Sequence, residues 1–289
     1  MTGKLDSLIV AQQNSSAQIV GWQFIPFGVA EPQSATVTIY RSEVENTGYS
    51  ILARVPAERG WFLDDTVDLI NRWQTAFYKL ELTVDGVTRE YGPVRIDQES
   101  DVQARGIVKH MNTTLRLSGI PVLVYQYLSS GERCPDCWDP CLRKVTVSNC
   151  GTCYGTGYQK GYHAPILTLS QMGVEAKQNQ VNERIEQDAS IEMLFSNYPV
   201  LRPGDLVYEI DRGRRYRVQQ VFTSEHHRTL VNQTASGFAL QTTDVEQQVP
   251  IPDISTMEPV LRRKRAPIRK VSSTNGEEFD NSTFDKVPF

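Results

Sequence analysis

The sequence predicts a mainly β protein with at least two folded units, and three observations lead to this prediction. Apolar and polar side chains alternate with a period of two in residues 36–40 and 77–82, as they do in half-buried antiparallel strands. One segment, residues 102–115, instead has its apolar side chains at helical spacing. With 289 residues, 39% of them hydrophobic, the chain is long enough for about two domains with cores of their own.

Residues 1–96 are predicted to form a small β-sandwich. Turn residues separate short apolar segments, and six of these segments are typical of strands: SLIVAQ, AQIVGWQF, ATVTIYRSE, YSILARV, AFYKLELTV and REYGPVRI. Trp22, Tyr40 and Tyr78 are interpreted as core residues, because aromatic rings on such strands pack more often than they bind ligands. Residues 65–74, which include Trp73, interrupt the pattern and are compatible with a short helical turn.

Residues 97–120 are predicted to form a linking helix. The acidic opening DQESD suits a helix N-terminus, and Ser118 followed by Gly119 is a stop signal. Apolar residues recur at helical spacing and predict the buried face: Val102, Ile107, Met111 and Leu115. His110 lies in this segment and is interpreted as a semi-buried or solvated residue, because no nucleophile is found at a matching offset.

Four cysteines form two Cys-x-x-Cys pairs with twelve residues between the pairs: Cys134, Cys137, Cys150 and Cys153. A two-residue gap lets one turn present two thiolates to one ion, and two such turns supply the four tetrahedral ligands of a structural zinc ion. Such a site leaves no ligand position for water, so we expect it to hold structure and not to hydrolyse. Residues 121–165 are therefore predicted to be a zinc-knuckle hairpin, a finger whose stability depends on the metal.

Two disulfides, or four unconnected thiols, are the alternatives for these cysteines. The sequence begins MTGKLDSLIV, without a charged and then apolar leader, so an oxidising compartment is not implied. The fifth thiol, Cys141, could exchange with a ligand, pair with another subunit or be buried. His163 is expected in a surface loop and not among the ligands. Trp138 and Tyr154, which each follow a cysteine pair, are expected to pack over it, with stacking on nucleic-acid bases as the alternative.

Residues 166–250 are predicted to form a small β-barrel and residues 251–289 an extended tail. Pro203-Gly204-Asp205 is a tight-turn signal, and Asp211-Arg212-Gly213 predicts a hairpin. Residues 173–189 are polar, and we expect an exposed loop or a short helix there. A basic run in the tail could contact DNA phosphates or an acidic groove of a partner, with a solvated arm as the alternative: Arg262, Arg263, Lys264, Arg265, Arg269 and Lys270.

The first unit resembles a fibronectin type III domain. The resemblance depends on Trp22, on TIYRSEVENTGYSILARV in residues 38–55, and on WFLDDTV leading to FYKLELTVDG in residues 61–86. In that family a core Trp, a strand ending in Y-x-R-S, an aspartate turn and a late Tyr recur in this order. The resemblance covers about a third of the chain and implies a fibronectin III-like sandwich.

The segment RPGDLVYEIDRGRRYRVQQVFTSEHHRTLVNQTASGFAL, residues 202–240, is similar to a strand pattern of the neck or head-closure proteins of tailed bacteriophages. Together with CPDCWDP and SNCGTCYGTGY, it makes the chain resemble a zinc-bearing virion neck protein. In that family, rings of a small β-barrel protein join the portal to the tail. The resemblance implies a homo-oligomeric ring, portal or connector proteins and tail proteins as partners, and a place in the virion after assembly in the host cytoplasm. The positions carried over are structural: Gly204, Asp205, Tyr216 and Val218.

The sequence thus predicts a structural virion protein that forms an oligomeric ring at the neck. Another tail or baseplate structural protein is one alternative, and a zinc-ribbon nucleic-acid-binding protein is the alternative from a different class. An enzyme is not expected, because no Ser/His/Asp order, phosphate-binding glycine loop or carboxylate-metal cluster is recognised. A membrane is not expected as a partner either, since the apolar runs are far too short to span a bilayer and the net charge is −4.

Overall fold

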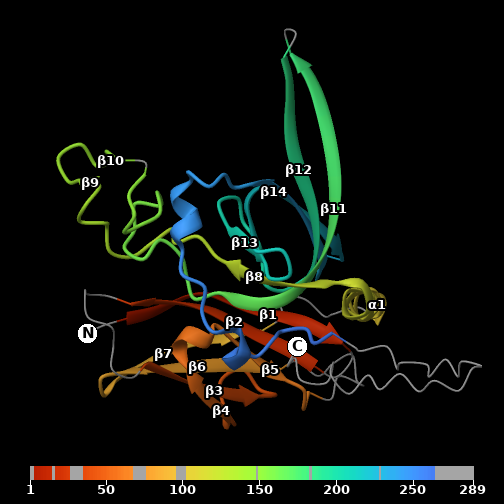
Figure 1. Ribbon diagram of the computed structural model, residues 1–289. Coiled ribbons are helices and arrows are strands. Elements are labelled where there is room, and N and C mark those ends of the chain that lie inside the picture. Colours follow the sequence, from red (N-terminus) through yellow and green to blue (C-terminus); the bar gives the residue numbers. More distant parts are fainter. Residues whose placement is uncertain are drawn as a thin grey trace, which may run out of the picture.

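The structure is a computed structural model that describes residues 3–14, 17–26, 35–67, 76–95, 102–147, 149–181, 184–227 and 229–263. For Asn14, residues 174–181 and residues 184–190 it describes the backbone alone. The protein is mainly β, as the sequence predicts. Figure 1 shows a two-sheet unit below, a barrel above it with a long two-stranded ribbon, and a looped finger beside the barrel.

Seven antiparallel strands form two sheets in the N-terminal unit, with strand orders β1-β2-β5 and β4-β3-β6-β7. One hydrophobic core takes side chains from both sheets, including Val20 and Trp22 from the first and Ile39 and Leu80 from the second. Each of the six segments with strand-like patterns overlaps one of these strands, with differences of one or two residues at some ends. Their bounds are β1 (Gly3–Asn14), β2 (Ala17–Pro26), β3 (Ala35–Ser42), β4 (Ser50–Pro56), β5 (Trp61–Asp64), β6 (Phe77–Val84) and β7 (Val87–Val94).

Two of the three predicted core aromatics are buried in this unit. Trp22 donates a hydrogen bond from Nε1 to the Ala57 carbonyl oxygen at 2.8 Å, and Tyr78 is fully buried. The prediction for Tyr40 is wrong, because this ring is only half-buried and its hydroxyl donates to Glu81. Val37 and Ile39 are the residues of β3 that enter the hydrophobic core, so strand alternation turns Tyr40 to the opposite face. Residues 68–75, with the expected helical turn and Trp73, lie outside the described residues.

The linking helix, α1, runs from Val102 to Ser118, but its buried face differs from the predicted one. Val102 and Ile107 are 56% and 39% exposed, whereas the buried residues are Ala104, Val108, Asn112 and Leu115. These lie four, four and three residues apart, which follows the helical repeat of 3.6. Of the residues at helical spacing in the sequence, Leu115 is buried and Met111 is half-buried. The buried face also includes Asn112, which a search for apolar residues passes over. Its Nδ2 donates to the Gln13 carbonyl oxygen at 3.0 Å, which satisfies the amide inside the joint with β1.

The C-terminal unit is a closed six-stranded barrel with the order β11-β12-β15-β14-β13-β8. Its first strand, β8, comes from residues that the sequence analysis assigned to the finger, so the barrel is assembled from both sides of that insertion. Gly213, at the predicted hairpin turn between β13 and β14, has a φ of 65° and donates its N–H to the Glu209 carbonyl oxygen. The strand bounds are β8 (Ile120–Tyr125), β11 (Ile166–Val181), β12 (Arg184–Ser196), β13 (Leu206–Glu209), β14 (Arg214–His226) and β15 (Thr229–Ala239).

The expectation of a loop or short helix at residues 173–189 is wrong. These residues form a ribbon in which β11 and β12 stay paired as far as Val181 opposite Arg184. β8 pairs with β11 only at residues 166–170, and β15 pairs with β12 only at residues 190–196. Beyond those residues the two strands have only each other as partners in the described structure, and Figure 1 shows them rising clear of the barrel.

The described part of the predicted tail, residues 251–263, packs against the body and is not extended away from it. Val260 and Leu261 are buried, the Val260 N–H donates to the Leu167 carbonyl oxygen at 2.9 Å, and Glu258 forms an ion pair with Arg59 at 2.9 Å. One short 3-10 turn, Val245–Gln248, precedes this segment, and a second, Ile254–Thr256, lies within it. The sequence did not indicate this packing, because prolines and charged residues surround the few apolar residues of the segment.

The two units, the helix and residues 251–263 meet in one apolar cluster. It includes Ile19 and Trp61 from the two-sheet unit, Leu115 from α1, Tyr198 beside the barrel, and Leu261. The finger leaves the barrel after β8 and returns at β11, so it emerges next to this joint (Figure 1). Among the residues that the structure describes, no helix has both the length and the apolar character needed to cross a bilayer.

Candidate metal centre

Residues 126–165 form the finger, and the two cysteine pairs shape it. A very short hairpin lies between the pairs, with β9 at Trp138–Asp139 and β10 at Lys144–Val145. Backbone hydrogen bonds close the first turn, from the Trp138 N–H to the Cys134 carbonyl oxygen at 3.1 Å. The second turn is tied to the first, because the Cys134 N–H donates to the Gly157 carbonyl oxygen.

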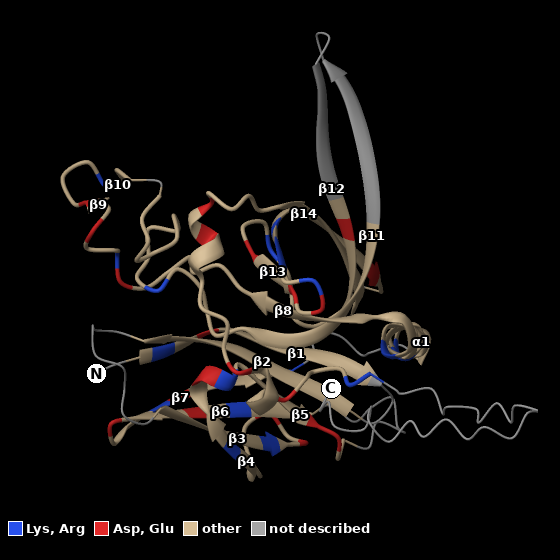
Figure 2. Ribbon diagram, viewed as in Figure 1, with Lys and Arg blue, Asp and Glu red and all other residues tan. Residues whose placement is uncertain are grey.

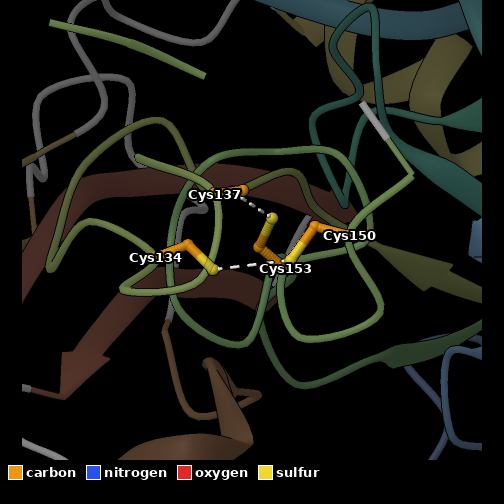
Figure 3. A group of neighbouring side chains, drawn as sticks. All are labelled: Cys134, Cys137, Cys150 and Cys153. Carbon is orange, nitrogen blue, oxygen red and sulfur yellow. Dashed lines mark hydrogen bonds between the residues drawn. The ribbon is translucent and has the colours of Figure 1, made fainter. Parts of the chain in front are cut away.

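The four paired cysteines lie together at the centre of the finger. Figure 3 shows their sulfur atoms pointing toward one another from the two turns. The Sγ atoms of Cys134 and Cys150 are 3.7 Å apart, those of Cys137 and Cys153 are 3.4 Å apart, and all four lie within 4.8 Å of one another. The spacing of the pairs in the sequence therefore brings together four possible metal ligands.

These distances separate two of the explanations considered from the sequence. A disulfide needs about 2.05 Å between its sulfur atoms, and all five cysteines are free thiols in the structure. Four sulfurs at about 2.3 Å from one tetrahedral zinc ion would be about 3.8 Å from each other, by the geometry of a tetrahedron. The separations of 3.4 and 3.7 Å are close to that value, and all four sulfurs lie within 4.8 Å of one another. The arrangement is thus compatible with one zinc ion and does not match paired disulfides.

The electrostatics of the cluster differ from one thiol to the next. Burial acts to raise the pKa of Cys150, but hydrogen bonds from the backbone N–H groups of Cys153 and Thr152 outweigh it and lower the pKa to about 7. Burial, together with hydrogen bonds from neighbouring thiols, raises the pKa of Cys137, and burial also raises that of Cys134. Metal binding requires thiolates, and the turn amides around Cys150 already favour one.

The cluster is closed to solvent. The four cysteines are between 0% and 7% exposed, and the apolar side chain packed against them is that of Val145. Four protein ligands with this little exposure leave no approach for a substrate. An ion bound there would act on the fold and not as a Lewis acid in catalysis.

One feature of the finger was missed in the sequence: an arginine held between two aromatic rings. The Arg133 guanidinium lies 4.0 Å from the centre of the Trp138 ring and 4.2 Å from that of Tyr158. Arg133 directly precedes Cys134, and Tyr158 follows the second pair, so the contact joins the two cysteine turns. The sequence signal for this contact is an arginine directly before a metal-ligand turn, with an aromatic residue after each cysteine pair.

The other predicted residues lie outside the four-sulfur cluster. Cys141 is exposed, and its N–H donates to Asp139 Oδ1, so its thiol is neither buried nor a ligand here. His163 is half-buried, not a surface residue, with Nδ1 3.3 Å from the Phe24 carbonyl oxygen; burial lowers its pKa to about 4. Tyr154 packs toward the barrel cluster and Tyr162 and does not cover the cysteine pair.

The positions taken from the neck-protein resemblance connect the barrel to the base of the finger. Gly204 has a φ of 95° at the predicted turn, and Tyr216 and Val218 are buried in the barrel core. Asp205 accepts hydrogen bonds from the Tyr127 N–H at 2.8 Å and the Arg202 N–H at 2.7 Å. Its carboxyl group is almost fully buried, and this burial raises its pKa to about 7.

Tyr127 extends this connection into the finger, because its hydroxyl donates to the Thr156 carbonyl oxygen at 3.0 Å. Thr156 in turn donates from Oγ1 to the carbonyl oxygen of Cys153. A continuous path of hydrogen bonds thus runs from the Asp205 turn of the barrel to a cysteine of the cluster. The metal centre and the barrel are mechanically joined at this point.

Comparison of the chain with protein-family models, with curated proteins and with solved structures gives no significant match.

Proposed function

We propose that Cys134, Cys137, Cys150 and Cys153 bind one structural zinc ion that stabilises the finger. The observation that supports this is that four sulfur atoms lie within 4.8 Å of one another in a buried cluster. Few other apolar side chains pack on the cluster, so metal binding would supply stability that the finger otherwise lacks. The zinc has no catalytic role in this proposal.

We further propose that the protein is a structural component of a tailed-bacteriophage virion and forms an oligomeric ring at the neck. The observation that carries this proposal is the β11–β12 ribbon. A two-stranded ribbon is at best marginally stable in water by itself, and both of its outer edges lack partners among the described residues. A neighbouring subunit, or a portal or tail protein, would cover such an arm in an assembly.

The two-sheet unit supports a fibronectin III-like fold within this proposal. Seven antiparallel strands in sheets of three and four around one core are the architecture that the sequence resemblance implies. Trp22 and Tyr78, two of the residues that carry the resemblance, are buried in that core. In the ring, this unit would lie on the side of the barrel opposite the ribbon, as Figure 1 places it.

The ring proposal is tested by native mass measurement and electron microscopy of the full chain. We expect closed rings of identical subunits, and we expect rings to be lost when residues 176–189 are replaced by a two-residue Asn-Gly turn between Glu175 and Ser190, which pair in the ribbon. The metal content of this variant should be unchanged, because the ribbon and the finger are separate. A strictly monomeric full chain that also fails to bind purified portal rings would contradict the proposal. Density for the chain at another level of the particle would favour a different tail or baseplate position.

The nucleic-acid-binding alternative is distinguished by the salt dependence of DNA binding. Figure 2 shows Lys and Arg interspersed with Asp and Glu along the described chain. Of the basic run expected to contact DNA, Arg262 and Arg263 are exposed, and Arg262 lies 3.8 Å from Glu258. Lys264, Arg265, Arg269 and Lys270 lie outside the described residues. Tight binding that weakens steeply with added salt would favour this alternative over the neck proposal.

A further inference from the structure

A cleft of about 580 Å³ separates three parts of the molecule. One wall is the end of β2, residues 22–26; the second is the finger, with Tyr154, Tyr158 and Tyr162; the third is residues 249–252. The volume lies in the range of sites that bind ligands or peptide side chains. Nothing in the proposed zinc and ring functions uses this cleft.

The cleft borders the edge of β2 at residues 22–26, where no described strand pairs with it on this side. Trp22 and Phe24 are buried at this edge. β5 pairs with β2 only at Gln18–Gly21, and the Trp22 N–H then donates to the Gly60 carbonyl oxygen at 2.9 Å. Backbone groups of alternate residues point to the same side of a strand, so the N–H and carbonyl of Phe24 face the cleft as well. His163 contacts that carbonyl, and no described strand pairs with residues 22–26 on this side. An extended segment could add here as a further strand.

The walls also define the chemistry of an occupant. Tyrosine rings and the prolines Pro26, Pro165, Pro250 and Pro252 line the interior, which favours apolar and prolyl side chains. Two exposed carboxylates, Glu58 and Glu132, lie at the lining of the cleft together with one lysine, Lys160, so acidic side chains outnumber basic ones there. A basic, proline-containing extended segment would therefore match both the interior and the charges.

The sequence contains such a segment directly after the last described residue. It continues for 26 residues beyond Arg263, and its first part, KRAPIRK at residues 264–270, places Pro267 and Ile268 between basic residues. The described chain lines the cleft at residues 249–252 and then runs along the body to Leu261, which lies in one cluster with Ile19 and Trp61. An extended chain spans about 3.3 Å per residue, so 26 residues reach much farther than needed.

We propose that residues 264–289 dock in this cleft of their own chain, with the basic part of the segment beside Glu58 and Glu132 and its backbone added to the edge of β2. Docking would cover the edge of β2 and bring the C-terminal segment against the finger. The proposal is independent of the ring and of DNA binding, so it can fail while those proposals stand, and they can fail while it stands.

The test compares the full chain with a chain that ends at Arg263, by hydrogen exchange at the Phe24 amide. We expect exchange to be at least about tenfold slower in the full chain, since a strand hydrogen bond protects the amide. A synthetic peptide of residues 264–289 should restore protection in the shortened chain, whereas a scrambled peptide of the same composition should not. Equal exchange in the two chains, or equal effects of the two peptides, would overturn the proposal. Protection that increases with protein concentration would also overturn it, because it would place the segment in a second copy.

A pair of matched charge variants tests the contacts in the full-length background. The double variant Glu58→Lys/Glu132→Lys reverses both cleft charges, and Glu45→Lys/Glu225→Lys makes the same change in net charge at exposed residues away from the cleft. We expect the first to weaken binding of the peptide to the shortened chain about tenfold and to speed Phe24 exchange in the full chain. The second should leave both unchanged. Equal behaviour of the two variants would contradict the proposed placement of the basic part.

Discussion

The barrel and the finger are adjacent in the chain and in space, yet different forces hold them. The barrel closes six strands around a cluster that includes Val122, Met193, Phe195 and Tyr216. The finger has two strands of two residues each and a cluster made of four thiols and Val145. The barrel can fold on its apolar side chains, whereas the finger is expected to need an ion. Two adjacent β regions of one chain can therefore be stabilised by different interactions, apolar packing in one and metal binding in the other.

Removal of two metal ligands should have the largest effect, and it should destabilise the finger without destabilising the barrel. We expect Cys150→Ser/Cys153→Ser to lose the metal and with it most of the finger's stability, for which small zinc peptides suggest a scale of about 10–16 kcal/mol. Hydrogen exchange should become fast in residues 133–158 and remain slow in β12 and β15. Metal analysis and exchange on the same sample check this. Uniformly fast exchange in both regions would show that the barrel depends on the ion too.

A cavity in the barrel core should have the converse effect. Phe195 is fully buried, so we expect Phe195→Ala to lower the free energy of unfolding by about 3–5 kcal/mol, from lost burial and an unfilled cavity. The metal content per chain should not change at temperatures where the variant is folded. Denaturant unfolding with metal analysis tests this, and loss of metal from the folded variant would contradict the separation of the two regions.

Asp205 lies where the two regions meet and should make stability depend on pH. Its pKa is raised from 3.8 to about 7 by burial, so the folded state holds the proton more tightly than the unfolded state does. Stability from this group is complete below about pH 4 and is lost as the pH rises to about 7. We expect the slope of unfolding free energy against pH in this window to be smaller in Asp205→Asn. Identical slopes in the two proteins would contradict the assignment.

The arginine between two rings should contribute less. Arg133→Ala removes the contacts with Trp138 and Tyr158, and we expect a loss of about 1–2 kcal/mol within the finger. The metal should stay bound, since Arg133 supplies no ligand, but a chelator should remove it faster. Arg133→Lys, which retains the charge without the planar group, should recover part of the effect. Unchanged chelation rates in both variants would show that the contact does not stabilise the site.

Cys141 should have the smallest effect of all. It is exposed and lies outside the four-sulfur cluster. We expect Cys141→Ser to leave metal content and unfolding free energy unchanged to within about 0.5 kcal/mol, as for most exposed positions. A fall in metal content in this variant would mean that Cys141 exchanges with one of the four ligands.

Local patterns predicted much of the structure because they report local constraints. Alternation located the strands of the two-sheet unit, and the Cys-x-x-Cys spacing identified the four thiols that the fold brings together. The failures concern features that depend on distant partners. Asn112 is buried because Gln13 accepts its hydrogen bond. Residues 174–181 are strand because they continue a barrel strand, although their own sequence is polar.

The boundary errors have the same cause. β8 joins the barrel through pairing with β11 and β13, whose sequences follow much later, so nothing within residues 120–125 separates a barrel strand from the base of a finger. Val260 and Leu261 look isolated in the sequence, but they complete a cluster with Ile19, Trp61 and Leu115. A residue's own surroundings in the chain could not show these contacts.

The stability of the finger depends most on how the four central sulfurs are bonded. X-ray absorption at the zinc edge tests this directly on protein of known metal content. We predict one zinc ion per chain with four sulfur neighbours at about 2.3 Å and no nitrogen or oxygen ligand. Protein that holds no metal, with a mass four hydrogens below that of the fully reduced chain, would instead contain two disulfides. That result would contradict a finger stabilised by an ion.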